Sequence, residues 1–300
     1  MDTKINIAGI EFKNPIMTAS GTFGSGMEYA DFVDLNELGA VITKGVSAIP
    51  WEGNPTPRVA ETPSGMLNAI GLQNPGVEVF INRDLEFLKQ FDVRIIVNVC
   101  GKTIEDYLKV VRALAGTGAD MLEINISCPN VKAGALSFGQ EPKVVEEITK
   151  KIKKEAKQPV IMKLTPNVTD IREIAKAAEA GGADAISLIN TITGMKIDIW
   201  KRKFALANKT GGLSGPAIHP VAVRMVYDCA RTVKIPIIGM GGVESGEDAI
   251  ELMLAGATAV AVGTSNFYRP DNAIRVLDEM AEVMEKQEVS DIKEFINGVS

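Results

Sequence analysis

The chain has 300 residues, of which 46% are hydrophobic and 23% are charged, and its formal net charge is -6. This composition is typical of a globular protein and excludes collagen-like and disordered chains. The acidic balance disfavours nucleic acid as a partner, because nucleic-acid-binding proteins usually carry a basic surface.

The N-terminal segment, MDTKINIAGI, lacks the basic and apolar regions of a signal peptide. The sequence has no apolar run of about 18 residues that would cross a membrane. Its three cysteines, Cys100, Cys128 and Cys229, are irregularly spaced, and such spacing suits a reducing compartment better than a disulfide framework. Three cysteines are too few for a four-thiolate iron-sulfur cluster. We therefore expect a cytoplasmic protein without a membrane partner, and no metal site.

Short apolar, β-branched runs alternate with helical segments along the chain, as in βαβ units. Eight such runs occur, at residues 15–19, 40–44, 94–98, 121–125, 160–163, 185–190, 236–240 and 259–263. Their near-continuous apolarity indicates strands that are buried on both faces. Without a break in composition, the pattern predicts one domain over residues 1–300, a single (β/α)8 barrel of the α/β class, with a doubly wound open sheet as the alternative.

A Gly-Ala pair precedes every second run and forms a weak internal repeat. The glycines are Gly39, Gly118, Gly182 and Gly256. Glycine adopts the left-handed conformation without a Cβ penalty, so we expect each of these residues to end a helix.

Three residue pairs have the spacing of a helix N-terminal capping box. They are Thr103 with Asp106, Asp170 with Glu173, and Ser245 with Asp248. Two connections, residues 46–92 and 191–235, are too long for simple loops and are expected to cover a functional site. Residues 272–296 have the pattern of an amphipathic helix.

Polar side chains follow most of the predicted strands where their apolar sequence stops. These residues are Ser20, Lys44, Asn98, Asn125, Lys163 and Asn190. Because active sites of such barrels form at the carboxyl ends of the strands, we expect these side chains to meet in one site.

Two glycine-rich segments, residues 239–243 and 263–265, follow the last two predicted strands. Barrels commonly bind phosphate at this position through backbone N–H groups. Neither segment has the spacing of the dinucleotide fingerprint. The sequence therefore predicts a phosphate site but no nicotinamide site in this chain.

Cys128 lies on the loop after the fourth run, between polar residues, whereas Cys100 and Cys229 are expected to be buried apolar residues. The single histidine, His219, is the conventional base that Cys128 could use. We expect His219 instead to begin a helix.

Several of these segments together resemble dihydroorotate dehydrogenase, over about residues 5–269. The matching motifs are KG at 44–45, NAIGLQN at 68–74, NISCPN at 125–130, KLT at 163–165, INT at 189–191, LANKTGGLSG at 206–215 and GG at 241–242. The family binds FMN at the mouth of a barrel and oxidises dihydroorotate to orotate in pyrimidine (UMP) biosynthesis.

The resemblance implies two sets of site residues. Around FMN it places Ser20, Lys44, Gly45, Asn98, Asn125, Lys163, Ile189, Gly215, Gly241, Gly242, Gly263 and Thr264. Around the substrate it places Lys44, Asn68, Ala69, Ile70, Gly71, Leu72, Asn125, Asn190 and Thr191.

The reaction explains why these residue types are useful. Oxidation of a saturated carbon–carbon bond requires a base for one proton and an acceptor for one hydride, which the flavin supplies. By resemblance, Cys128 is the base, and Lys44 supplies positive charge near the flavin and the substrate carboxylate. The three amides, Asn68, Asn125 and Asn190, can both donate to and accept from a planar pyrimidine.

Segments 71–76 and 207–212 are more similar to the NAD-linked class of the family, whose partner subunit carries FAD and a 2Fe-2S cluster. The resemblance implies a homodimeric core of this chain within a heterotetramer. One alternative is a relative that reduces fumarate without a partner. Alternatives from other classes are a lyase or aldolase with a Schiff base on Lys44 or Lys163, and a non-catalytic subunit that only supports a flavoprotein.

Overall fold

Eight parallel strands close into a barrel. The computed structural model describes residues 1–127 and 138–299. The barrel strands, in chain order, are β3 (Ile16–Thr18), β4 (Ala40–Ile42), β7 (Arg94–Val99), β8 (Met121–Asn125), β9 (Val160–Lys163), β10 (Ala185–Leu188), β15 (Ile237–Met240) and β16 (Ala259–Val262). Each strand pairs with the next, and β16 pairs with β3. The barrel is confirmed and the open sheet is wrong.

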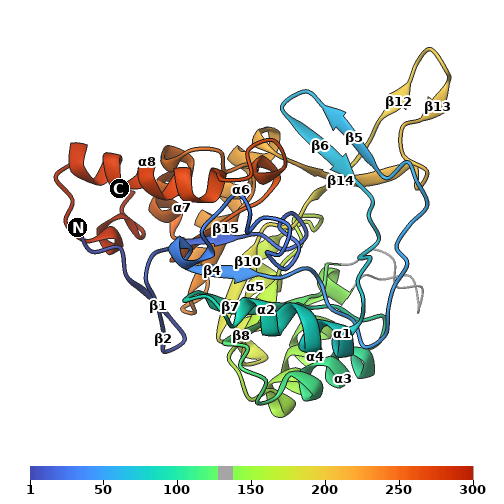
Figure 1. Cartoon of the computed structure of the whole chain (residues 1–300), viewed down its shortest axis with the longest axis horizontal. Coiled ribbons are helices and arrows are strands. Elements are labelled where there is room, and N and C mark those ends of the chain that lie inside the picture. The colour runs from blue at the N-terminus through green and yellow to red at the C-terminus, as the bar shows by residue number, and fades with distance from the viewer. Residues whose placement is uncertain (128–137, 300) are drawn as a thin grey trace.

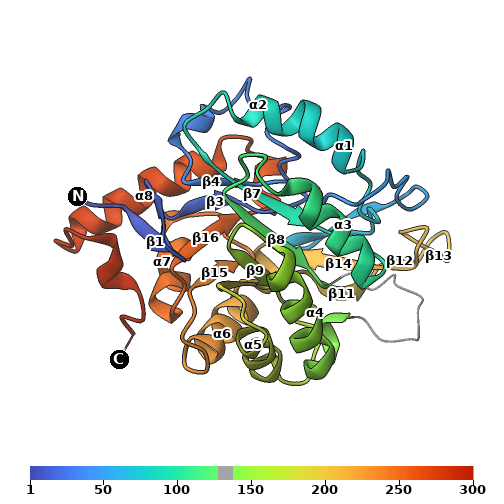
Figure 2. The ribbon, with the colours of Figure 1, turned by 90° about the horizontal axis from the view of Figure 1, so that it is seen from below.

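Helices surround the barrel, as Figure 2 shows. The longer helices are α3 (Ile104–Leu114), α4 (Pro142–Glu155), α5 (Ile171–Ala180), α6 (His219–Ala230), α7 (Gly246–Ala255) and α8 (Asn272–Lys286). A helical segment before β7 comprises α1 (Val77–Val79), the π-helix η2 (Phe80–Leu85) and α2 (Glu86–Leu88). The shorter 3-10 helices are η1 (Leu35–Glu37), η3 (Phe138–Gln140), η4 (Pro216–Ile218), η5 (Thr264–Phe267) and η6 (Ile292–Phe295).

The barrel strands are buried because they are covered on both sides. Seven of them have no exposed or half-buried residue, and in the eighth, β7, only Arg94 is exposed. The helices bury one apolar stripe each; in α3 this stripe includes Tyr107, Val110, Val111 and Leu114. A continuous apolar core joins the strands to the surrounding helices.

The two long connections meet in one antiparallel sheet, which the sequence analysis did not predict. Its strands are β5 (Val59–Thr62) and β6 (Gly65–Asn68) from the first connection, and β11 (Ile192–Met195) and β14 (Thr210–Ser214) from the second, in the order β11-β14-β6-β5. A further hairpin, β12 (Ile197–Asp198) and β13 (Lys203–Phe204), projects beyond this sheet in Figure 1. The N-terminal strands β1 (Ile5–Ile7) and β2 (Ile10–Phe12) form a separate hairpin.

The local signals at helix ends were partly correct. Gly182 and Gly256 follow helices with positive φ, and Gly118 also has positive φ, three residues beyond the cap of α3. The prediction for Gly39 was wrong, because its φ lies outside the left-handed region. Gly39 is instead required by close approach: a Cβ there would lie 2.2 Å from the backbone oxygen of Asn14.

Capping boxes form at Thr103 and at Ser245. Asp170 also caps its helix, but its side chain accepts from the backbone of Arg172, so the box predicted with Glu173 is absent. The C-terminal helix ends at Lys286 rather than at residue 296. In the part of the chain that the structure describes, no helix is long and apolar enough to cross a membrane.

Removal of the α7 cap should lower stability without changing the fold. In this cap the Ser245 hydroxyl accepts from Asp248 N at 3.2 Å, and the Asp248 carboxylate accepts from Ser245 N at 2.9 Å. We expect Ser245→Ala to reduce the free energy of unfolding by about 1 kcal/mol, measured by urea denaturation. The exposed Ser290→Ala is the control; equal stability of the two variants would contradict the capping role.

Candidate active site

A cavity of about 430 Å³ opens at the carboxyl ends of the barrel strands. Its floor and walls come from residues that end or follow these strands, and residues of β6 and β14 line it from the antiparallel sheet. The volume lies in the range of small-molecule sites in proteins. The long connections therefore contribute to the site, as predicted.

Most of the residues predicted for the site line this cavity. They are Ser20, Lys44, Gly45, Asn68, Ala69, Ile70, Gly71, Leu72, Asn125, Lys163, Ile189, Asn190, Thr191, Gly241, Gly242, Gly263 and Thr264. Asn98 and Gly215 are not among the lining residues. Cys128 lies outside the described residues.

Two lysines bring positive charge to the cavity. Lys44 follows β4 and is half-buried, whereas Lys163 ends β9 and is buried. Burial lowers the pKa of the Lys44 ammonium below its ordinary value; a smaller effect from Cys100 opposes this, and Arg58 adds to it. An anionic ligand beside Lys44 would favour its charged form.

Lys163 has a buried counter-ion. Its Nζ lies 3.5 Å from Glu123 Oε2, and the two side chains are 5% and 0% exposed. Asn98 Nδ2 donates to the same carboxylate oxygen at 2.5 Å, and Ser187 Oγ donates to the other at 2.7 Å. Asn98 therefore lies one layer below the cavity, which explains why this residue is not part of the lining.

Three amide side chains meet from different elements. Asn125 ends β8, Asn190 follows β10 and Asn68 ends β6. Asn125 Oδ1 accepts from Ser127 N at 3.2 Å, and Asn190 Oδ1 accepts from Thr191 N at 2.8 Å. These bonds orient Asn125 and Asn190 from their carbonyl ends and leave their amide donors for a ligand, whereas Asn68 Nδ2 donates to Gly212 O at 3.5 Å.

The glycine-rich segments form one end of the cavity. Gly241 and Gly242 both have positive φ, and a Cβ on Gly242 would lie 2.7 Å from the backbone oxygen of Gly215. Glycine is thus required there, and it leaves backbone N–H groups uncovered. Thr264 Oγ1 donates to Ser214 Oγ at 2.8 Å, which connects this end to β14. This end has the character of an anion site.

Asn167 also lines the cavity, although it was not predicted from the sequence. Its Nδ2 donates to Thr191 O at 3.0 Å, and its Oδ1 accepts from Thr193 N at 2.9 Å. Its backbone oxygen accepts from Gln140 Nε2 at 3.0 Å, and Gln140 also lines the cavity. Its position two residues after the KLT motif was the available signal.

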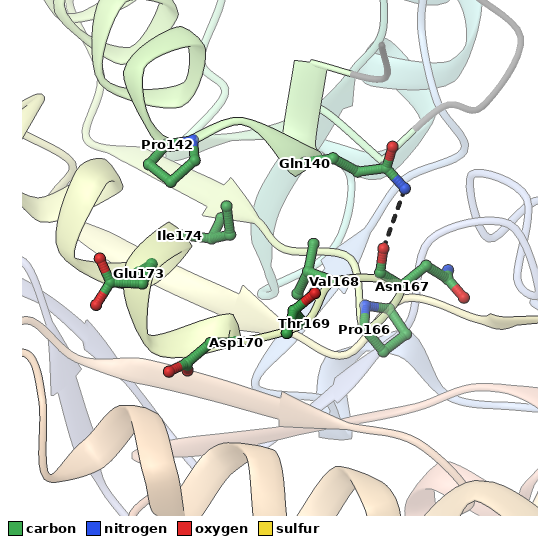
Figure 3. A pocket seen from close by; sticks show the side chains of 9 residues that line it. All are labelled: Gln140, Pro142, Pro166, Asn167, Val168, Thr169, Asp170, Glu173 and Ile174. Atoms are coloured by element: carbon green, nitrogen blue, oxygen red, sulfur yellow. Dashed lines mark hydrogen bonds between the residues drawn. The ribbon is translucent and has the colours of Figure 1, made fainter.

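Asn167 and Gln140 also line a second cavity of about 600 Å³ at the start of α5 (Figure 3). The hydrogen bond between them lies where the two cavities adjoin. Among the described residues, the second cavity is lined by the acidic Asp170 and Glu173 and by no basic side chain, which disfavours an anion there.

The two described cysteines are buried in the core, and the histidine lies at the start of a helix. Cys100 and Cys229 are fully buried, and burial raises the pKa of the Cys229 thiol to about 12. His219 begins α6, as predicted, and its Nδ1 lies 2.8 Å from Gly241 O. Its Nε2 lies 3.1 Å from Glu251 Oε2.

One group of potential metal ligands occurs among the described residues. It comprises His219, Asp248 and Glu251, whose ligand atoms lie within 4.8 Å of one another. His219 is already engaged by hydrogen bonds on both ring nitrogens, and nothing else indicates a metal there.

Comparison with known proteins gives a consistent result. Residues 3–284 match the family model for dihydroorotate dehydrogenase. A relative from Lachnoclostridium phytofermentans, named dihydroorotate dehydrogenase B (NAD(+)), catalytic subunit, is 64% identical over 100% of both chains. A relative of the same name from Thermoanaerobacter pseudethanolicus is 53% identical over 100% of this chain and 99% of its own.

The fold has a solved counterpart in the crystal structure of DHODH in complex with ferulenol from Eimeria tenella. That chain is 25% identical, with a TM-score of 0.83, and the match covers 98% of this chain and 88% of that one. Together with the family model and the full-length relatives, this likeness shows that the chain belongs to the dihydroorotate dehydrogenase family.

Proposed function

We propose that this chain is the FMN-containing catalytic subunit of an NAD-linked dihydroorotate dehydrogenase, which oxidises (S)-dihydroorotate to orotate in the synthesis of UMP. The observation that carries this proposal is the cavity at the barrel rim, which combines two lysines, several amide side chains and a glycine-rich end. The names of relatives that match over the whole chain support it.

The residues of the cavity fit FMN. The turn at Gly241 and Gly242, with Gly263 and Thr264, would hold the phosphate, because a side chain at Gly242 would close this space. The Asn98 Oδ1 atom lies next to Gly45, which lines the cavity, and it is buried without a hydrogen-bond partner among the described residues. A donor group of a bound flavin would satisfy this atom. Lys163 and Asn125 would contact the ring. When bound, the flavin supplies the acceptor for the hydride of the substrate.

The remaining lining residues would bind dihydroorotate. Lys44 offers a cation for the carboxylate, and Asn68, Asn125 and Asn190 offer donors and acceptors for the carbonyl and N–H groups of the ring. Cys128 is proposed as the base that removes the proton, on the resemblance of the NISCPN motif alone. The segment 68–72 would enclose the substrate from the side of the antiparallel sheet.

Electrons must leave this chain for another acceptor. We propose a partner subunit with FAD and a 2Fe-2S cluster, NAD as final acceptor, and a homodimer of this chain within a heterotetramer, with residues 1–300 as one FMN-binding domain. The words "catalytic subunit" in the names of the relatives agree with a partner. The sequence has three cysteines and no dinucleotide fingerprint, so a separate NAD-binding chain is expected.

The Schiff-base alternative is less well supported. The Lys163 Nζ atom already faces the Glu123 carboxylate at 3.5 Å, so this side chain is engaged in an ion pair rather than free to react. Lys44 has the lowered pKa that such chemistry uses, but family membership favours oxidation. Borohydride trapping of a carbonyl substrate on Lys44 would reverse this preference.

The proposed function is tested by anaerobic flavin reduction. We expect the purified chain to bind FMN and its absorbance to bleach when dihydroorotate is added, because the substrate transfers a hydride to the flavin. NAD and fumarate should not reoxidise the reduced chain until the partner subunit is added. Efficient reoxidation by fumarate alone would favour the partner-free class, and failure to bind FMN would overturn the proposal.

In the same experiment, Cys128→Ala should bind FMN as the wild type does but be reduced about 100- to 10,000-fold more slowly, because the base is missing. Cys229→Ala is the matched control, since that thiol is buried away from the cavity lining. Unchanged reduction in Cys128→Ala would remove Cys128 from the base role.

The lowered pKa of Lys44 predicts proton uptake when orotate binds. In the absence of the ligand, burial favours the neutral amine at alkaline pH below its ordinary pKa. The ligand carboxylate restores the charged form, so protons are taken up in this range and not at lower pH, where the ammonium is already formed. Calorimetry in two buffers of different ionisation enthalpy measures the uptake.

The variant Lys44→Met should bind orotate about tenfold or more weakly and take up no protons. Lys176→Met, on the exposed side of α5, should behave as the wild type. Proton uptake that persists unchanged in Lys44→Met would contradict this role of Lys44.

A further inference from the structure

Glu123 is an ionisable side chain in the interior of the barrel. It lies in the middle of β8, two residues before Asn125, and it is fully buried. Side chains two residues apart on a strand point to the same side. Glu123 therefore lies one layer further into the barrel than Asn125, which lines the cavity.

Donor groups from three other barrel strands converge on the Glu123 carboxylate: its two neighbours, β7 and β9, and the next strand, β10. Ser187 Oγ of β10 donates to Oε1, and Asn98 Nδ2 of β7 donates to Oε2. Lys163 Nζ of β9 faces Oε2 at 3.5 Å. A set of donors around both oxygens fits an ionised carboxylate, which only accepts.

The pair formed by Glu123 and Lys163 has no net charge, and only its positive end reaches the cavity. Lys163 lines the cavity, whereas Glu123 does not. Interactions between charges are strong in a buried site because the effective dielectric constant is low. The carboxylate therefore weakens the positive field that Lys163 exerts on a ligand.

This field matters if the ligand is a flavin, which gains negative charge on reduction. A charge close to the ring shifts the reduction potential of such a cofactor. An uncompensated lysine would stabilise the reduced form strongly and hinder the transfer of electrons to the next acceptor.

We propose that Glu123 is a positioning residue that acts as the counter-ion of Lys163 and thereby lowers the reduction potential of the bound flavin. This inference rests on the proposed FMN site, and it assigns to the interior of the barrel a function beyond packing. Ser187 and Asn98 hold the carboxylate in place for this role.

The test is the midpoint potential of bound FMN in four proteins: wild type, Glu123→Gln, Lys163→Met and the double variant. Glu123→Gln leaves the lysine uncompensated, so we expect the potential to rise by an amount that corresponds to at least a tenfold change in equilibrium, about 30 mV for a two-electron couple. Lys163→Met leaves the carboxylate uncompensated, so the potential should fall. The potential of the double variant should be higher than that of Lys163→Met.

Opposite shifts of this kind distinguish a charge effect from a structural one, since loss of packing would not change sign. Glu123→Asp, which keeps the charge, should shift the potential less than Glu123→Gln. Glu147→Gln, on the exposed face of α4, makes the same change of net charge away from the site and should leave the potential unchanged.

A potential that is unchanged or lower in Glu123→Gln would overturn the role of Glu123. If Glu123→Gln does not fold, the midpoint potentials of Lys163→Met and the double variant are compared instead to test the role of Glu123. The double variant is suitable because it buries no unpaired charge. Equal potentials of these two would overturn the proposal. Wild-type protein that binds no FMN would overturn both the proposed function and this inference, whereas normal flavin reduction with unchanged potentials would overturn the inference alone.

Discussion

Closure of the parallel barrel is the constraint on which the rest of the structure depends. In a closed parallel sheet, all strands end at the same rim, so residues far apart in the chain meet there. Lys44 follows β4 and Asn190 follows β10, yet both line one cavity. The rim also fixes the separation of the two ends of the site, with amides after β8 and β10 and glycine turns after β15 and β16. The barrel thus supplies the arrangement, and residues at the strand ends and in the following loops supply the chemical groups.

The interior of the barrel combines stability with a charged layer. Most interior positions are apolar and fully buried, but Asn98, Glu123 and Ser187 form a hydrogen-bonded group beneath the cavity. A buried ion pair contributes little stability compared with well-packed apolar residues of similar size, because both ions lose their hydration. The presence of the ion pair here is best explained by its effect on the cavity, because Glu123 weakens the positive field that Lys163 exerts there.

Much of the fold could be predicted because strands buried on both faces have a simple pattern. All eight barrel strands correspond to apolar runs, and β8 and β9 have the predicted ends. The antiparallel sheet could not be found in this way. Its central pairing joins Asn68 to Gly212 across more than a hundred residues, and no local pattern encodes such a contact. Gly39 was misinterpreted because a close approach to another segment, rather than a helix end, requires its glycine.

Most of the polar residues at the predicted strand ends line the cavity, and Asn98 is the exception. Asn98 has the same signal as Asn125, but its side chain points to Glu123 below the cavity, a distinction that depends on the register between strands. Glu123 itself is a charged residue within an apolar run, and this anomaly was visible in the sequence. The role of Cys128 still depends on the family motif, because that residue lies outside the described part of the chain.

The central claim is that the cavity at the rim holds a flavin phosphate at its glycine-rich end. It is tested most directly by titrating the apoprotein with FMN and with riboflavin, which differ only in the phosphate. Two or more charge-assisted hydrogen bonds from the turns at Gly241 and Gly263 should make FMN bind about 100-fold more tightly or better. Equal affinities for the two compounds would contradict the account.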